Sequence, residues 1–193
     1  GSDPANVLQR LRDAGLIRER RQPLRPLSFY QLTESAARLR GFSIKRARPL
    51  KFQSLSTHLA VLWFCCMTDT NRRRLERHHL DRLFPSELAA GPLPPHCLED
   101  ISGRRRLYRL FVPGAHTDAA NLVHRLTGYL AATRELPKMG SWLQAGQYRF
   151  GVLCENEQKI RTVDESLKRN GLKPFVFVRY APGHRTIADA VRR

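Results

Sequence analysis

A short segment near the start of the chain carries side chains that can recognise nucleic acid. Asn6, Gln9 and Arg10 follow one another at spacings that place them on one face of a helix. Side chains of these types form hydrogen bonds with base edges in the major groove of DNA, and arginine also binds phosphates. The chemistry that this segment indicates is therefore recognition of DNA bases.

Three groups of basic residues extend this candidate surface. The predicted contacts are Arg18, Arg20, Arg21 and Arg25 in a hairpin, Lys45, Arg46 and Arg48 after it, and Arg104, Arg105, Arg106 and Arg109 further along. Arginine suits the paired binding of phosphate oxygens, so the third group would extend a phosphate-binding surface into the second half of the chain. For that group, a solvated loop and strand edge is the alternative interpretation.

The chain as a whole is strongly basic. Its 193 residues include 34 Lys and Arg against 17 Asp and Glu, which gives a formal net charge of +17, and most of the basic residues are arginine. Residues 1–50 carry a net charge of +7 and residues 101–150 carry +6, whereas 51–100 are neutral. A GC-rich genome can explain the arginine excess but not the shortage of acids. A polyanionic partner is therefore the simplest explanation of the charge.

The composition also excludes several classes of protein. An apolar fraction of 41% supports a core, which argues against disorder. The longest apolar run, Leu59–Met67, is far shorter than the roughly 20 residues that cross a bilayer, and no signal peptide opens the chain. We expect a bacterial cytoplasmic protein associated with the nucleoid or a plasmid. Gly1-Ser2 resembles a cloning remnant, so we expect the natural chain to extend further at its N-terminus.

The cysteines and histidines do not predict a metal site. The chain has four cysteines in apolar surroundings, Cys65, Cys66, Cys97 and Cys154. Such cysteines are typical of reduced, buried thiols in a cytosolic protein. Adjacent pairs such as His78-His79 and His96-Cys97 point apart on a helix or strand, whereas zinc sites favour two to four residues between ligands. We predict neither a metal nor a cofactor.

Local signals predict the elements that position the first candidate surface. Asp3 caps a helix that has Pro4 at its first position and ends at Gly15. One face of this helix carries the apolar residues Val7, Leu8, Leu11 and Ala14. Strands at 16–21 and 28–32 form a hairpin, and a helix capped by Thr33 follows through Leu39.

This part of the chain resembles the end of a winged helix-turn-helix domain. The resemblance is carried by Val7-Leu8-Gln9-Arg10-Leu11-Arg12-Asp13-Ala14-Gly15-Leu16-Ile17, the basic hairpin, and Tyr30-Gln31-Leu32-Thr33-Glu34. It implies that Asn6, Gln9 and Arg10 enter the major groove while the hairpin arginines hold the backbone or the minor groove. The first two helices of such a domain are missing, so either the chain is truncated or another element covers the exposed apolar face.

The rest of the chain alternates between helical and strand periods. A basic connector at 43–53 leads into a buried helix that is capped by Ser54 or Ser56 and runs to Met67, and the proline-rich stretch 85–95 forms a loop. Strands are predicted at 106–112, 148–154 and 174–180, with helices at 117–133 and from the Asn156 cap to Asn170-Gly171. Helical crossovers between these strands predict that they pair in parallel.

A second resemblance covers most of the chain. The hairpin ending in Leu-Thr, then Leu55-Ser56-Thr57-His58-Leu59-Ala60-Val61, then a small α/β domain resemble the replication-relaxation family of plasmids and mobile elements. That family implies a winged helix joined to a nuclease-like fold, whose usual site is Pro-Asp followed by (Asp/Glu)-x-Lys. Here His96 stands after Pro95 in place of the acid, and the strand that follows has no carboxylate. The resemblance therefore implies the fold without its catalytic site.

The catalytic alternative is a Mg²⁺-dependent nuclease that uses Glu99, Glu157 and Lys159. Carboxylates would hold the metal, and the lysine would polarise the attacking water. Glu157 and Lys159 have the spacing of the second half of the motif, but they open a helix, where an acid in the first turn is expected for the helix dipole alone. We therefore predict that no residue of the chain is catalytic.

These features together predict an α/β protein, α+β overall. We expect a partial winged helix at 3–42, a basic linker at 43–53, and a nuclease-like α/β domain with a mixed sheet at 54–193. The predicted function is duplex DNA binding by a regulator or accessory factor of replication, mobilisation or transcription on a mobile element. The expected partners are double-stranded DNA, a second copy of the chain and a protein bound by the α/β domain. The third alternative is an adaptor that binds an acidic protein or RNA.

Overall fold

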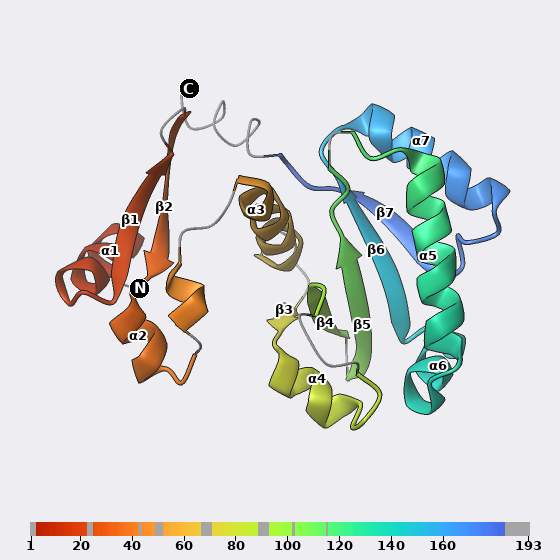
Figure 1. The fold of residues 1–193 in the computed structure, drawn as a ribbon, viewed down its shortest axis with the longest axis horizontal. Helices are drawn as coiled ribbons and strands as arrows, with labels where there is room; N and C mark the ends of the chain where they lie inside the picture. Colours follow the sequence, from red (N-terminus) through yellow and green to blue (C-terminus); the bar gives the residue numbers. More distant parts are fainter. Residues whose placement is uncertain are drawn as a thin grey trace. The chain divides into compact units, whose positions relative to one another are not determined.

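The helices and strands form two compact units, one ending at Phe52 and the other beginning at Gln53 (Figure 1). The computed structural model describes residues 3–22, 25–42, 44–48, 52–66, 71–88, 93–101, 103–114 and 116–183. Residues 184–193, which were predicted to belong to the second domain, lie outside this description. The boundary between the units falls at the end of the predicted linker, 43–53.

The first unit begins with a helix and a two-stranded hairpin. Helix α1 (Pro4–Asp13) is capped by Asp3, whose carboxylate accepts a hydrogen bond from the Ala5 amide at 3.1 Å. Strands β1 (Ile17–Gln22) and β2 (Arg25–Leu32) pair antiparallel, and Thr33 caps α2 (Glu34–Leu39) as predicted. These elements follow from local signals: a capping side chain at each helix start and alternating residues in each strand.

The small core of this unit lies around α2. Ala36 and Ala37 are buried together with Ala47 of a 3-10 helix, η1 (Ile44–Ala47), which packs against α2 and β2. Residues 44–48 of the predicted linker therefore belong to the folded first unit.

Helix α1 contributes no buried residue. Of the four residues predicted to share one apolar face, Val7 is 40% exposed and Ala14 is exposed, while Leu8 and Leu11 are half-buried, so this face is only partly covered in the described structure. The reason is that α1 packs mainly against β1, and a single strand is too narrow to cover the apolar face of a helix.

A mixed five-stranded sheet forms the centre of the second unit. Its strands are β3 (Arg72–Leu75), β4 (His96–Ile101), β5 (Arg104–Phe111), β6 (Tyr148–Cys154) and β7 (Val176–Tyr180), side by side in this order. β3, β4 and β5 pair antiparallel, and β5, β6 and β7 pair parallel. The predicted α/β class, which is α+β over the whole chain, and the predicted parallel pairing are confirmed.

Helices cover both faces of this sheet (Figure 1). The larger core lies on the face covered by α5 (Ala119–Arg134), α6 (Pro137–Gln144) and α7 (Glu157–Arg169), with further side chains from α4 (Arg77–Leu83). The smaller core lies on the face covered by α3 (Phe52–Cys66) and includes Phe64, Cys97, Tyr108 and Leu110. Gly151 leaves room for the Phe177 ring on this second face, where an added Cβ would lie 2.5 Å from that ring.

Several sequence predictions for the second unit are wrong. α3 begins at Phe52, so Ser54 and Ser56 lie inside the helix and do not cap it. Leu62 is 50% exposed, because α3 is a single helix on its face of the sheet and buries only one side. Cys66 is exposed, whereas the other three cysteines are buried, and all four are free thiols.

Five of the described elements were not predicted at all: η1, β3, α4, β4 and α6. β3 consists almost entirely of arginine, and its strand conformation depends on pairing with β4, which no local pattern reveals. Among the described residues, no helix has the length and apolar character needed to cross a membrane.

Candidate nucleic-acid interface

The polar face of α1 is open to solvent. Asn6, Gln9 and Arg10 are all exposed, as a face that contacts DNA requires. Gln9 donates to the Asp13 carboxylate at 2.8 Å and accepts from Arg12 at 2.8 Å, so it is held along the helix. The side chains of Asn6 and Arg10 form no hydrogen bond and no ion pair with another described residue. These two side chains lie one helical turn apart and are available to a ligand.

The hairpin arginines are less uniform than the sequence suggests. Arg18 is half-buried and donates to the backbone carbonyl of Ala47, while Gln31, opposite it in the hairpin, donates to the carbonyl of Arg48. Arg18 therefore joins the hairpin to η1. Arg20 is also half-buried, and Arg48 is exposed. The side chains of Arg21, Arg25, Lys45 and Arg46 lie outside the described part of the structure.

The strand period divides the third basic group between two faces of the sheet. Arg104 and Arg106 share the face of Tyr108, on the side of α3, because side chains alternate along a strand. Arg105 points to the opposite face, where it lies 4.0 Å from the Asp100 carboxylate. Arg109 shares that opposite face, and its guanidinium lies 3.9 Å from the centre of the Tyr129 ring. The sequence analysis predicted that these four arginines form one patch. In the structure, Arg104 and Arg106 lie on one face of the sheet, and Arg105 and Arg109 lie on the other.

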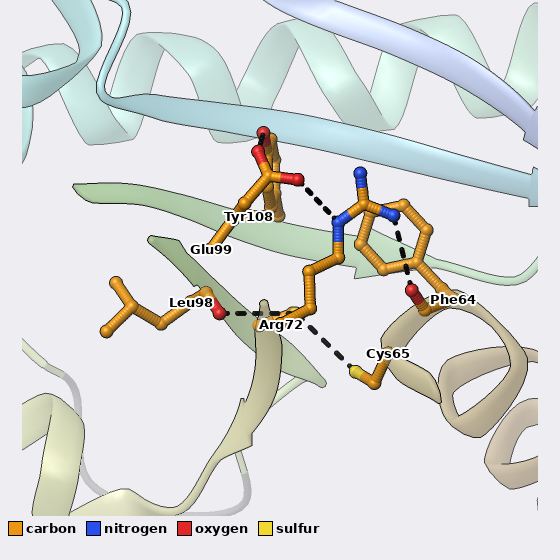
Figure 2. A network of polar contacts seen from close by, with 7 residues as sticks. Phe64, Cys65, Arg72, Leu98, Glu99 and Tyr108 are labelled. Atoms are coloured by element: carbon orange, nitrogen blue, oxygen red, sulfur yellow. Dashed lines mark hydrogen bonds and ion pairs between the residues drawn. The ribbon is translucent and has the colours of Figure 1, made fainter. Parts of the chain in front are cut away.

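The carboxylate of Glu99 is buried on the α3 side of the sheet (Figure 2). In the strand register, Glu99 lies opposite Arg106. Glu99 is 2% exposed, and one of its oxygens lies 2.7 Å from Nε of Arg72. The Tyr108 hydroxyl donates to its other oxygen. Arg72 also donates to the Phe64 carbonyl at 3.3 Å and lies over the Phe64 ring. Both oxygens of Glu99 are therefore engaged by side chains of β3 and β5.

The surroundings of Tyr108 confirm that this site is largely shielded from water. Burial, followed by the hydrogen bond to Glu99, raises the pKa of Tyr108 to about 12, against a smaller opposing effect of Arg106. The phenol therefore remains protonated near neutral pH and keeps donating to the carboxylate.

Two thiols meet next to this carboxylate (Figure 2). The Cys65 sulfur on α3 lies 3.4 Å from the Cys97 sulfur on β4, and Cys97 also contacts the carbonyl of Leu98. The contact with Cys65 and burial both raise the pKa of Cys97, whereas the contact with Cys97 lowers the pKa of Cys65. The pair packs in the space between the helix and the sheet.

The residues of the catalytic alternative are not brought together. Glu157 lies in the first turn of α7, exposed and paired with Arg161 at 3.6 Å, and Lys159 donates to the Gly114 carbonyl. Both follow the carboxyl end of β6, whereas Glu99 faces the start of β5. Glu99 lies opposite Arg106, one residue before the pair Leu107 and Tyr148, and β6 ends at Cys154. The separation along the strands is therefore about 20 Å. Within the described ranges, no group of three His, Cys, Asp or Glu side chains is placed to hold a metal.

His96 stands where the nuclease motif would have its acid. It is buried, and its Nδ1 lies 2.9 Å from the carbonyl of Pro94, the geometry of a hydrogen bond donated by the ring. Burial lowers the pKa of His96 to about 4, so the ring is neutral near neutral pH. A buried neutral imidazole fits the role of a core residue.

Lys159 lines a pocket of about 310 Å³ between the starts of α5 and α7. The other residues that line it are Thr117, Asp118, Ala119, Asn156, Gln158, Thr162 and Val163. Asn156 caps α7 by accepting from the Lys159 amide at 2.8 Å, so helix capping accounts for its presence.

Neither a family model, a curated protein nor a solved structure matches this chain. The function of its surfaces is therefore argued from their own geometry and charge. Sequence analysis missed Arg72, Tyr108 and Arg149, which share the α3 face with Arg106. Residues two positions apart on a strand lie on the same face, as do Arg72 and Arg74 on one strand and Arg104 and Arg106 on another. This spacing was the available signal in the sequence.

Proposed function

We propose that this protein binds duplex DNA and does not cut it, acting as a regulator or accessory factor of replication, mobilisation or transcription on a bacterial mobile element. The first unit inserts α1 into the major groove, with Asn6, Gln9 and Arg10 toward the bases. The single observation that carries this proposal is the exposure of α1: none of its residues is buried, and Asn6 and Arg10 are unengaged among the described residues.

The charge of the chain supports a phosphate-rich partner. Ion pairs within the chain do not reduce this excess, because each joins one basic and one acidic residue. Most ion pairs among the described residues join residues four apart on one helix, as in Arg77 and Asp81. Such exposed pairs contribute little and do not remove the long-range positive field. A field of this sign attracts duplex DNA and speeds its binding.

The state of Glu99 supports binding without hydrolysis. A nuclease needs carboxylate oxygens that are free to hold Mg²⁺. Both oxygens of Glu99 are already bound by Arg72 and Tyr108, and Glu157 lies at the other end of the strands. Among the described residues, no group of three His, Cys, Asp or Glu side chains is placed to hold a metal.

Selection of bound sequences from a random duplex pool tests the role of α1. The wild-type chain should enrich a defined motif, and Arg10→Ala should lose discrimination at one position by about tenfold, since a paired contact to a base discriminates by roughly 1–3 kcal/mol. Arg40→Ala is the matched control, because Arg40 is an exposed residue of the same unit and its substitution removes the same charge. Equal effects of the two variants, or no enriched motif, would contradict the proposal.

A further inference from the structure

The register of the sheet gathers four arginines at one end of its α3 face. Arg72 of β3 lies opposite Glu99 of β4, which lies opposite Arg106 of β5. In the next row on the same face, Tyr108 of β5 lies opposite Arg149 of β6. Arg104, two residues before Arg106, shares this side of the strand. We call Arg104, Arg106 and Arg149 the sheet-end arginines.

Among the described residues, no acid forms an ion pair with the sheet-end arginines. Glu99 is held by Arg72 at 2.7 Å and by the Tyr108 hydroxyl, which uses both of its oxygens. Asp100 points to the other face, where it lies near Arg105 and accepts from the Gly103 amide. Helix α3, which packs on this face, contains no acidic residue. The local charge is therefore positive.

The position of the Arg149 side chain favours binding of a negatively charged ligand. Its guanidinium lies 5.8 Å from the centre of the Phe177 ring, which restricts its movement. Its Nε is buried, and it finds no hydrogen-bond acceptor among the described residues. That buried atom is out of reach of a ligand, but the half-buried Arg149 side chain pairs with no acid among the described residues, so an incoming phosphate would supply a counter-charge.

We propose that the sheet-end arginines form a second binding surface, which holds the phosphodiester backbone of duplex DNA. This inference rests on the proposed function, because it assigns a further contact with the same ligand. Arg104 and Arg106 are exposed and Arg149 is half-buried, so all three are accessible to a ligand at the end of the sheet. It reads no bases and adds affinity for every sequence.

The dependence of duplex affinity on salt concentration tests this surface in the full-length protein. The probe is a labelled duplex of mixed sequence, with the single strand of the same sequence as a second arm. Arg106→Ala and Arg149→Gln should each reduce the steepness of the log–log slope by about 0.9, the contribution of one phosphate contact. Arg105→Ala is the matched control: it is the neighbouring arginine of the same tract, but it faces the opposite side beside Asp100. Its slope should stay that of the wild type.

Arg106→Lys distinguishes the effect of losing the positive charge from an effect of the substitution on folding. Because lysine keeps the positive charge, this variant should retain the wild-type slope. If Arg106→Ala and Arg149→Gln keep the wild-type slope while Arg10→Ala still loses discrimination, this inference is wrong and the proposed function stands. If Arg106→Ala lowers the slope but Arg10→Ala changes nothing, the second surface stands and the role of α1 is wrong. A loss confined to the single-strand arm would overturn the assignment to duplex DNA.

Discussion

Replacing Glu99 by glutamine should destabilise the second unit, because it removes a charge that Arg72 needs. Arg72 is 15% exposed by side chain and Glu99 is 2% exposed, so most of the pair is shielded from water. Removing one partner of a buried ion pair costs about 3–5 kcal/mol of unfolding free energy. The partial exposure of Arg72 lets water replace some of the lost interaction, so we expect the lower value, about 3 kcal/mol.

Urea unfolding followed by tryptophan fluorescence measures this effect. Both tryptophans of the chain, Trp63 and Trp142, belong to the second unit, so the signal reports on the unit that contains Glu99. Arg72→Met should cost a similar amount, since it leaves the carboxylate without its cation. The double variant Arg72→Met/Glu99→Gln should recover most of the loss, because the two residues are coupled.

Two results would refute this reasoning. A loss below about 1 kcal/mol in Glu99→Gln would show that the pair contributes no more than an exposed one. Additive losses in the double variant would show that the two side chains are not coupled. If Glu99→Gln instead kept full stability and abolished a Mg²⁺-dependent cleavage of DNA, Glu99 would be a metal ligand and the chain a nuclease.

Two further predictions follow from burial. Burial lowers the pKa of His96 to about 4 in the folded protein, so between about pH 4 and 6.5 the unfolded chain binds a proton that the folded chain does not. The stability due to neutral His96 is therefore present above about pH 6.5, and it is lost as the pH falls toward 4. Urea unfolding should show a loss of about 2 kcal/mol from this group by about pH 5. His96→Gln should flatten that dependence and His124→Gln, which changes an exposed residue, should not; an unchanged profile in His96→Gln would contradict the assignment. For the thiols, a maleimide should modify Cys66 alone in the native protein, as peptide mass mapping would show, and equally fast labelling of Cys65 or Cys97 would contradict their burial.

Elements with local signals could be predicted from the sequence. The caps at Asp3, Thr33 and Asn156 each bind the backbone of their helix, since such contacts involve residues only a few positions apart. β6 was predicted with its observed limits because it is a short, mostly apolar segment, interrupted by Arg149, that is bounded by polar residues on both sides.

Features that depend on pairing between distant segments could not be predicted. β3 is a charged strand that is ordered by pairing with β4 more than twenty residues later, as the register between Arg72 and Glu99 shows. The same register decides that Arg104 and Arg106 lie with Arg149, whereas Arg105 and Arg109 point away. Charge can be counted from the sequence, but the face on which it lies depends on strand order and register.

The affinity of the wild-type chain for a short mixed-sequence duplex, measured against salt concentration, tests the central claim most directly. Each phosphate contact contributes about −0.9 to the log–log slope, so contacts from α1, the hairpin and the sheet-end arginines together predict a slope steeper than about −3, with the duplex left intact in Mg²⁺. A slope shallower than about −3, or cleavage of the duplex, would contradict the account.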